Sequence, residues 1–248
     1  MKPVFQLTNV SVTFPKNAIR RRSFVHTLAT LLEEKEEPAF RALDTVTLRI
    51  DEHEHVGLIG RNGAGKTTLM RVLSGVITPQ QGGVFINRRK HIVPLLELGI
   101  GFHPDLSGRE NCYLSGMLMG YTKRDIDERL PGIIAFAELG EFFDEPVKTY
   151  SSGMFARLAF ALATDVQPDV LLVDEVFGVG DEFFLRRCVA RMQRLMRGGT
   201  TTVFVSHNLD FLVTQCSRLI WLDRGRIVMD GAPLDVANAY RSSGGHYD

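Results

Sequence analysis

Residues 60–67, GRNGAGKT, combine three glycines with a lysine and a threonine in one short segment. They match the phosphate-binding loop (P-loop) pattern G-x-x-x-x-G-K-[ST] at every fixed position. Glycines permit a tight loop whose N–H groups face an anion, and the positive end of the following helix strengthens that field. Lys66 can then reach the β- and γ-phosphates of a nucleotide, and the Thr67 hydroxyl can coordinate Mg²⁺. The predicted nucleotide-binding residues are Gly60, Arg61, Asn62, Gly63, Ala64, Gly65, Lys66, Thr67 and Thr68.

Acidic and imidazole side chains follow two apolar runs further along the chain. Asp174 and Glu175 come directly after VLLV, and Ser206 and His207 come directly after TTVFV. Asp174 is placed to hold Mg²⁺, Glu175 to polarise the water that attacks the γ-phosphate, and His207 to orient that water. Without the P-loop, the acid pair would equally fit a helix start and the histidine a structural role. With it, we predict a nucleotide-hydrolysing site whose catalytic residues are Glu175 and His207.

The hydrophobic pattern predicts an α/β fold that positions these residues. The apolar runs at 170–173 and 201–205 are typical of strands covered on both faces in a parallel sheet. Alternation and turn residues predict further strands at 5–14, 45–50, 84–87, 217–222 and 226–228, the last two joined by a hairpin turn at 223–225, with a turn at 78–83. Helices are expected at 155–163, 183–197 and 233–241.

The middle of the chain has a different pattern. From about residue 105 to residue 164 the periodicity is mostly helical, broken at Gly120, Pro131 and Gly140. We therefore expect one domain over residues 1–248, in which a helical subdomain (about 105–164) is inserted into a P-loop core with a β-subdomain. The core and the β-subdomain would comprise about residues 1–104 and 165–248.

A polar insertion at residues 15–40 separates the first two strands. Its segment 23–37 has helical periodicity and is expected to form a solvated surface helix. Arg20, Arg21 and Arg22 precede that helix, and guanidinium groups suit phosphate. They could meet a lipid pyrophosphate at a membrane surface, or they could pair with the glutamates that follow them.

Charge, cysteines and hydropathy exclude several classes of protein. Lys and Arg total 29, as do Asp and Glu, so there is no basic excess of the kind that favours nucleic-acid binding. The three cysteines are widely spaced, which favours buried reduced thiols over a zinc site or a disulfide framework. The chain has no signal-peptide pattern and no apolar run long enough to span a bilayer. Any membrane-embedded part would be supplied by another chain.

Together with YSSGM at residues 150–154, these motifs resemble the ATP-binding subunits of ABC transporters. YSSGM stands about twenty residues before Asp174, where that family has its signature loop. The resemblance implies ATP and Mg²⁺ as cofactors. It also implies that the signature loop contacts ATP held by a second copy of the subunit. The signature residues are Ser151, Ser152, Gly153 and Met154.

The resemblance assigns roles to other residues. Ser151 and Gly153 would contact the γ-phosphate across the dimer, and the segment that ends at Asp181 looks like the loop that couples the two sites. Phe14 stands where the family stacks an aromatic ring on adenine, although the ring would also fit a core position. Glu97 stands where the family has a glutamine, and its carboxylate could touch Mg²⁺ or a bound water.

Two departures from the family pattern point to a narrower branch: YSSGM replaces LSGGQ, and ELG replaces the glutamine segment. Together with residues 95–111, 148–163, 173–184 and 204–210, they are similar to the subunits that power export of lipid-linked polysaccharides. The resemblance runs from about residue 7 to residue 240. Longer O-antigen members carry an extra C-terminal β-domain that binds the glycan end. This chain ends after its last expected helix, so glycan-end recognition is not expected of it.

This branch implies an ATPase coupled to export of O-antigen, with capsule or teichoic acid as alternatives. It implies a homodimer bound to two copies of a separate multi-span membrane subunit at the cytoplasmic face of the inner membrane. The cargo would be a lipid-linked polysaccharide, and no nucleic-acid partner is expected.

Three other functions stay open. The first is an ABC exporter subunit for another lipid or a drug. The second is a soluble ABC ATPase of translation or DNA repair, for which two fused halves, a coiled coil or a basic surface would be expected. The third is a P-loop regulatory module that binds without hydrolysis, which Glu175 and His207 together disfavour.

Overall fold

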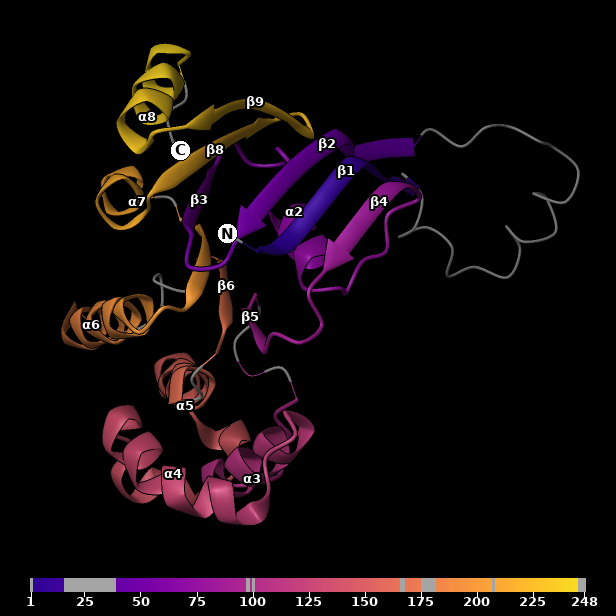
Figure 1. Cartoon of the computed structure of the whole chain (residues 1–248). Helices are drawn as coiled ribbons and strands as arrows, with labels where there is room; N and C mark the ends of the chain where they lie inside the picture. Colours follow the sequence, from indigo (N-terminus) through magenta and orange to yellow (C-terminus); the bar gives the residue numbers. More distant parts are fainter. Residues whose placement is uncertain are drawn as a thin grey trace, which may run out of the picture.

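The structure is a computed structural model that describes residues 2–15, 39–96, 99, 101–165, 168–174, 182–206 and 208–244. Figure 1 shows two β-sheets with a helix between them, further helices along one side, and a helical lobe at one end. The predicted insertion lies outside the described residues except at its flanks, and so do its expected helix at 23–37 and Arg20, Arg21 and Arg22. The predicted α/β class is confirmed.

The larger sheet carries the strands that matter most for the site. Its order is β5-β6-β7-β3-β8-β9, in which the first five strands are parallel and β9 is antiparallel to β8. The strands are β3 (His55–Ile59), β5 (Ile92–Leu95), β6 (Val170–Asp174), β7 (Thr201–Val205), β8 (Arg218–Asp223) and β9 (Arg226–Gly231). Along β6, Leu172 packs into one core whereas Leu171 and Val173 pack into the other. Burial on both faces explains the continuous apolar run.

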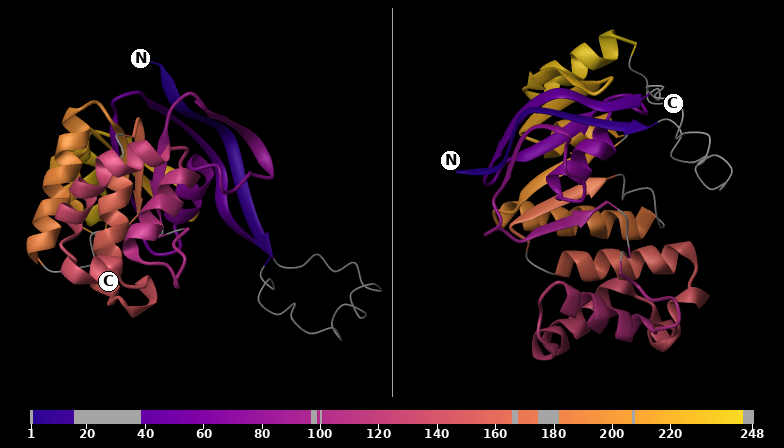
Figure 2. Two further views of the ribbon diagram at one scale, coloured as in Figure 1. Left: turned by 90° about the horizontal axis from the view of Figure 1, so that it is seen from below. Right: turned by 90° about the vertical axis from the view of Figure 1, so that its right-hand side faces the viewer.

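The smaller sheet is antiparallel, in the order β2-β1-β4, and packs over α2. Its strands are β1 (Pro3–Pro15), β2 (Ala39–Asp51) and β4 (Gln81–Ile86), and α2 spans Lys66–Leu73. One core cluster joins the inner faces of these strands, Leu69 and Met70 of α2, and one face of the larger sheet. Figures 1 and 2 show α2 held between the two sheets.

The boundary expected for β4 was wrong. A turn was predicted at 78–83, but the strand already begins at Gln81. Gly82 has φ 87°, and a Cβ there would lie 2.3 Å from the Asn9 carbonyl oxygen. The pairing of β1 with β4 shifts register between Thr8 and Ser11, so the glycine fits a bulged ladder. Residues 81–83, which were predicted as part of a turn, therefore belong to β4, because β1 lies close enough to pair with them.

Three α-helices and two 3₁₀ turns form the helical lobe (Figure 1). They are α3 (Gly108–Leu118), α4 (Lys123–Ala137), η1 (Gly140–Asp144), η2 (Val147–Thr149) and α5 (Ser152–Asp165). The expected breaks near Gly120 and Gly140 are confirmed, because α3 ends before the first and α4 before the second. The break at Pro131 was wrong, since α4 continues through it. The proline is exposed, whereas Ile133 and the rest of the apolar face stay buried and hold the helix together.

The other helices in the described part of the chain are α6 (Glu182–Arg197), α7 (Leu209–Gln215) and α8 (Pro233–Ser242). Neither α7, which is two turns long, nor β5 was predicted from the sequence. β5 is four residues long, contains Pro94 and forms an edge of the larger sheet, where a missing N–H is tolerated. Within the described part of the chain, no helix is both long and apolar enough to span a bilayer.

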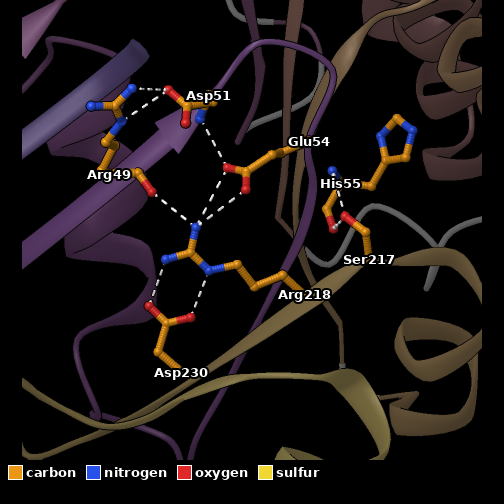
Figure 3. Close-up of polar contacts among 7 residues, drawn as sticks. All are labelled: Arg49, Asp51, Glu54, His55, Ser217, Arg218 and Asp230. Carbon is orange, nitrogen blue, oxygen red and sulfur yellow. Dashed lines mark hydrogen bonds and ion pairs between the residues drawn. The ribbon is translucent and has the colours of Figure 1, made fainter. Parts of the chain in front are cut away.

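An ion-pair network ties the two sheets together at the amino end of β3 (Figure 3). The Arg218 guanidinium donates to both carboxylate oxygens of Asp230, at 2.6 and 2.7 Å, and to the carbonyl oxygen of Arg49 at 3.0 Å. Its Nη1 also lies 3.4 Å from both carboxylate oxygens of Glu54, which accepts a bond from Asp51 N. This single side chain therefore links β8 and β9 to the end of β2.

Candidate functional site

The P-loop connects the end of β3 to the start of α2, as the sequence predicted. Gly60, Gly63 and Gly65 have φ values of 146°, 78° and 106°, which residues with a Cβ rarely adopt. The glycines of the motif are therefore required by the backbone path itself. Because the N-cap of α2 is Gly65, no side chain caps the first turn of this helix. The N-terminal N–H groups of α2 suit an anion.

Close packing adds a second requirement at two of these glycines. A Cβ at Gly60 would lie 2.2 Å from the Leu222 carbonyl oxygen, and one at Gly65 would lie 2.4 Å from the Ala42 carbonyl oxygen. A Cβ at Gly63 would meet no atom within 4 Å apart from its own chain neighbours. The first and last glycines thus let β8 and β2 approach the loop, whereas the middle one serves only the turn.

A brace that the sequence analysis missed holds the loop from the side. Gly225 N donates to the Ala64 carbonyl oxygen at 2.9 Å, and Asp44 N donates to the Gly225 carbonyl oxygen at 2.8 Å. The Asp44 carboxylate accepts from Arg226 and Arg41, both at 2.7 Å, and these bonds, that to Arg226 first, lower its pKa. The only sequence signal was the hairpin turn, which gave no hint of contacts with residues far away in the chain.

Lys66 lies inside the curve of the loop. Only 6% of the residue is exposed, and Nζ donates to the Gly60 carbonyl oxygen at 2.5 Å and to that of Arg61 at 3.2 Å. The ammonium is therefore already held where a polyphosphate enclosed by the loop would meet it. The next residue, Thr67, is exposed in the first turn of α2.

The carboxyl ends of β6 and β7 lie beside this loop. In the register of the sheet, Asp174 is level with Val205, and Val205 is level with Leu58, two residues before the P-loop begins. Ser206 follows β7, is buried, and accepts a bond from Asn208 N at 3.1 Å. The structure thus brings Asp174 to the edge of the sheet that carries the P-loop.

Four predicted site residues lie outside the described residues: Glu97, Glu175, Asp181 and His207. Each of them has at least one described neighbour in the sequence. Glu175 follows the last residue of β6, and Asp181 precedes the first residue of α6.

Thr67 and Asp174 are the described residues that could hold Mg²⁺. Among the described residues there is no group of three or more His, Cys, Asp or Glu side chains placed to bind a metal. Mg²⁺ in nucleotide sites is held by one or two protein oxygens plus phosphates and waters, so a hydroxyl and a single carboxylate fit this ion.

The signature segment forms the start of α5. The helix begins at Ser152, three residues earlier than expected, and Ser151 Oγ accepts from Met154 N at 3.2 Å. Tyr150 anchors this start, since its hydroxyl donates to the Phe142 carbonyl oxygen at 2.7 Å and burial raises its pKa to about 12. Figures 1 and 2 place α5 in the helical lobe, apart from α2. Ser151 and Ser152 are exposed, with Gly153 and Met154 partly so.

Phe14 is not a core residue. It is 38% exposed near the end of β1 and lies opposite Phe40 on β2, which is 48% exposed. β2 then passes the P-loop at Ala42. The alternative core placement is therefore wrong, and two exposed aromatic rings stand on the same pair of strands.

The three cysteines, Cys112, Cys188 and Cys216, are free and buried, as predicted. Burial raises the pKa of each thiol to about 12.

A P-loop between a parallel strand and a helix, with an acidic residue ending a nearby strand, defines a nucleotide-binding α/β protein. The family model described as "ABC transporter" matches residues 43–178. The chain belongs to the ABC transporter family.

Named relatives cover almost the whole chain. An O-antigen export system ATP-binding protein RfbB of Klebsiella pneumoniae is 37% identical over 98% of this chain and 99% of its own length. The RfbB protein of Myxococcus xanthus is 42% identical over 96% of this chain, which spans 55% of that relative. The teichoic acids export ATP-binding protein TagH of Bacillus cereus is 40% identical over 87% of this chain and 39% of its own length.

Solved structures confirm the fold. The ATP-binding cassette MJ0796, in a dimeric post-hydrolysis state bound to ADP and Pi, superposes with a TM-score of 0.73 at 23% identity, over 92% of this chain and 98% of that one. Another, an ATP-binding subunit of an ABC transporter, has a TM-score of 0.75 at 21% identity, over 98% of this chain and 94% of that one.

Proposed function

We propose that this chain is the ATP-hydrolysing subunit of an ABC exporter that moves a lipid-linked polysaccharide across the cytoplasmic membrane. The observation that carries the proposal is its identity of 37–42%, over 96–98% of its length, to two proteins named for O-antigen export. O-antigen is therefore the cargo proposed first. The relative named for teichoic acid export supports a second cargo of the same chemical class.

The proposed chemistry follows from the positions of the side chains. The P-loop amides and Lys66 hold the phosphates, while Thr67 and Asp174 hold Mg²⁺, together with Glu97. The ion supplies positive charge against the β- and γ-phosphates when it is bound. The Glu175 carboxylate accepts a hydrogen bond from the attacking water and so polarises that water, and His207 orients it.

The proposed assembly is a homodimer with ATP between the two copies. Ser151 and Gly153 of one copy would contact the γ-phosphate held by the other, and Asp181 would lie at the shared interface. The separation of α5 from α2 within one chain supports this arrangement, and so does the exposure of Ser151 at a helix start. The exposed ring of Phe14 is free to stack on adenine.

The proposed location is the cytoplasmic face of the inner membrane, where two copies of a separate multi-span subunit would hold the dimer. The argument for this partner is the naming of the relatives as components of export systems. In this proposal the cargo binds to the complex of the dimer with the two membrane subunits.

The decisive experiment separates hydrolysis from binding. Glu175→Gln should leave ATP affinity intact and lower turnover roughly 10²–10⁴-fold, because only the base is lost. Lys66→Ala should weaken nucleotide binding itself by roughly 10–100-fold, because charged hydrogen bonds are lost. Glu128→Gln is the matched control, since that exposed carboxylate pairs with Arg124 within α4. A normal rate in E175Q would refute the assigned chemistry.

A second measurement tests the partner. The tagged chain should co-purify from membranes with a multi-span subunit, and polysaccharide export should stop in its absence. Recovery of the chain alone, with export unchanged, would favour the soluble alternatives instead.

A further inference from the structure

Glu138 adopts a backbone conformation that does not suit its residue type. It follows α4 as the C-cap residue, with φ 52° and ψ 46°, in the left-handed region. Its N–H donates to the Ile134 carbonyl oxygen at 3.1 Å, a bond that any residue with an N–H could make. Glycine is the usual residue in this region because it has no Cβ. Glu138 therefore occupies a left-handed C-cap position where glycine would cost less.

The Glu138 carboxylate lies between arginines from two other helices. Its Oε1 is paired with Arg187 Nη1 of α6, and its Oε2 lies 3.7 Å from Arg157 Nη1 of α5. Arg187 Nη2 also donates to the Ala135 carbonyl oxygen at 3.2 Å. Arg187 of α6 therefore contacts the end of α4 twice, through this hydrogen bond and through its ion pair with Glu138. Both arginine side chains are about three-quarters or more buried, whereas the Glu138 side chain is 46% exposed. One carboxylate thus joins three helices.

An aromatic cluster fixes the two arginines in place. Phe136 of α4 and Phe184 of α6 are buried, with ring centroids 5.6 Å apart. Arg187 lies over the Phe136 ring at 4.8 Å, and Arg157 lies over the Phe184 ring at 5.0 Å. Cation–π contacts with these buried rings favour the observed positions of both guanidinium groups beside Glu138.

These contacts lie close to two segments of the proposed active dimer. Arg157 is four residues, about 6 Å of helix rise, beyond Gly153 of the signature segment. Arg187 is on the first turns of α6, the helix that directly follows Asp181. We propose that Glu138 is a positioning residue. Through Arg157 and Arg187 it locks the signature segment to the start of α6, so that both segments meet the partner's ATP as one body.

This inference rests on the proposed function, because it assumes that ATP joins two copies. It predicts a defect in ATP-driven dimerisation without a loss of folding. Glu138→Gly tests this directly: glycine accepts the backbone conformation without strain while the carboxylate is removed. Glu138→Gln keeps the size and removes only the charge. Glu128→Gln is the matched control, since that carboxylate pairs with Arg124 within α4.

The measurement is the dissociation constant of the ATP-bound dimer, in a Glu175→Gln background that prevents turnover. We expect E138G and E138Q to raise that constant about tenfold, a size typical of coupling between sites. ATP affinity of the monomer should stay unchanged. The midpoint of thermal unfolding should fall in E138Q, because two largely buried arginines lose their carboxylate, and should fall less in E138G, because relief of the backbone strain offsets part of that loss. E128Q should match the parent in all three.

An unchanged dimer constant in E138G and E138Q would overturn the inference while leaving the proposed function in place. A lower unfolding midpoint in E138G that accounts for the whole dimer defect would also overturn it, because the role would then be structural. If the Glu175→Gln parent stays monomeric at saturating Mg·ATP, the proposed function is wrong and the inference fails with it.

Discussion

His55 is a half-buried imidazole at the start of β3, with Nδ1 3.0 Å from Thr202 Oγ1 (Figure 3 shows the residue). Burial first, and then the neighbouring His53, lowers its pKa below the usual 6.5. The unfolded chain therefore binds this proton more readily than the folded chain. Stability should be fully present above pH 6.5 and should fall as the pH drops toward the lowered pKa.

The measurement is the free energy of unfolding in denaturant between pH 8 and pH 5. One proton gives a slope of at most about 1.4 kcal/mol per pH unit, and solvent around the half-buried ring reduces it. His55→Gln should flatten this slope. A slope that is the same in the variant and the parent would show that other groups cause it.

At the level of single residues, the sequence predicted what depends on a short segment. The P-loop glycines, Lys66 and Thr67 lie within one turn and one helix start, so their spacing determines their geometry. The brace from Asp44 and Gly225 could not be predicted, because 181 residues separate the two in the chain. The contacts of the Glu138 carboxylate with Arg157 and Arg187 were missed for the same reason, since these arginines come from other helices.

At the scale of elements, Pro131 lies in the interior of α4 although proline disfavours that position. A proline in a helix interior lacks the N–H that would bond four residues back, and it costs about 3 kcal/mol relative to alanine. It lies on the exposed side of α4, so no core contact depends on its ring. Pro131→Ala should raise stability by roughly 1–3 kcal/mol and the midpoint of thermal unfolding by about 2–10 °C.

The matched control for this prediction is Pro233→Ala. That proline is at the first position of α8, where a missing N–H costs nothing and the fixed φ suits the helix. Its replacement should bring no gain. Equal effects of the two substitutions would mean that proline acts here only through the unfolded chain.

A helix, strand or turn could be predicted where a single physical requirement determines its residues. The runs that became β6 and β7 are buried on both faces, and Arg224 and Gly225 both have the positive φ that a two-residue hairpin needs. The errors arise where packing overrides local preference. Pro131 stays helical because the opposite face of α4 is buried, and β4 extends through Gly82 because β1 lies against it.

At the scale of the whole molecule, the two ends of β3 have separate tasks. The carboxyl end leads into the P-loop, whereas the amino end adjoins the network around Arg218, five residues of strand away, or about 15 Å. The network joins the two sheets, and the P-loop is held by its own brace from β2 and the hairpin turn. Stability and nucleotide affinity should therefore respond to different substitutions.

Arg218→Met tests this separation. The Arg218 side chain is 26% exposed, and loss of its guanidinium leaves the carboxylates of Asp230 and Glu54 without their main counter-charge. We expect a loss of roughly 1–3 kcal/mol in the free energy of unfolding, because part of the cost is screened by solvent. Arg241→Met, which removes an exposed pair with Asp210, should change it by less than about 1 kcal/mol. ATP affinity of the folded protein should be the same in both variants. A marked loss of affinity in R218M would mean that the two ends of β3 are coupled.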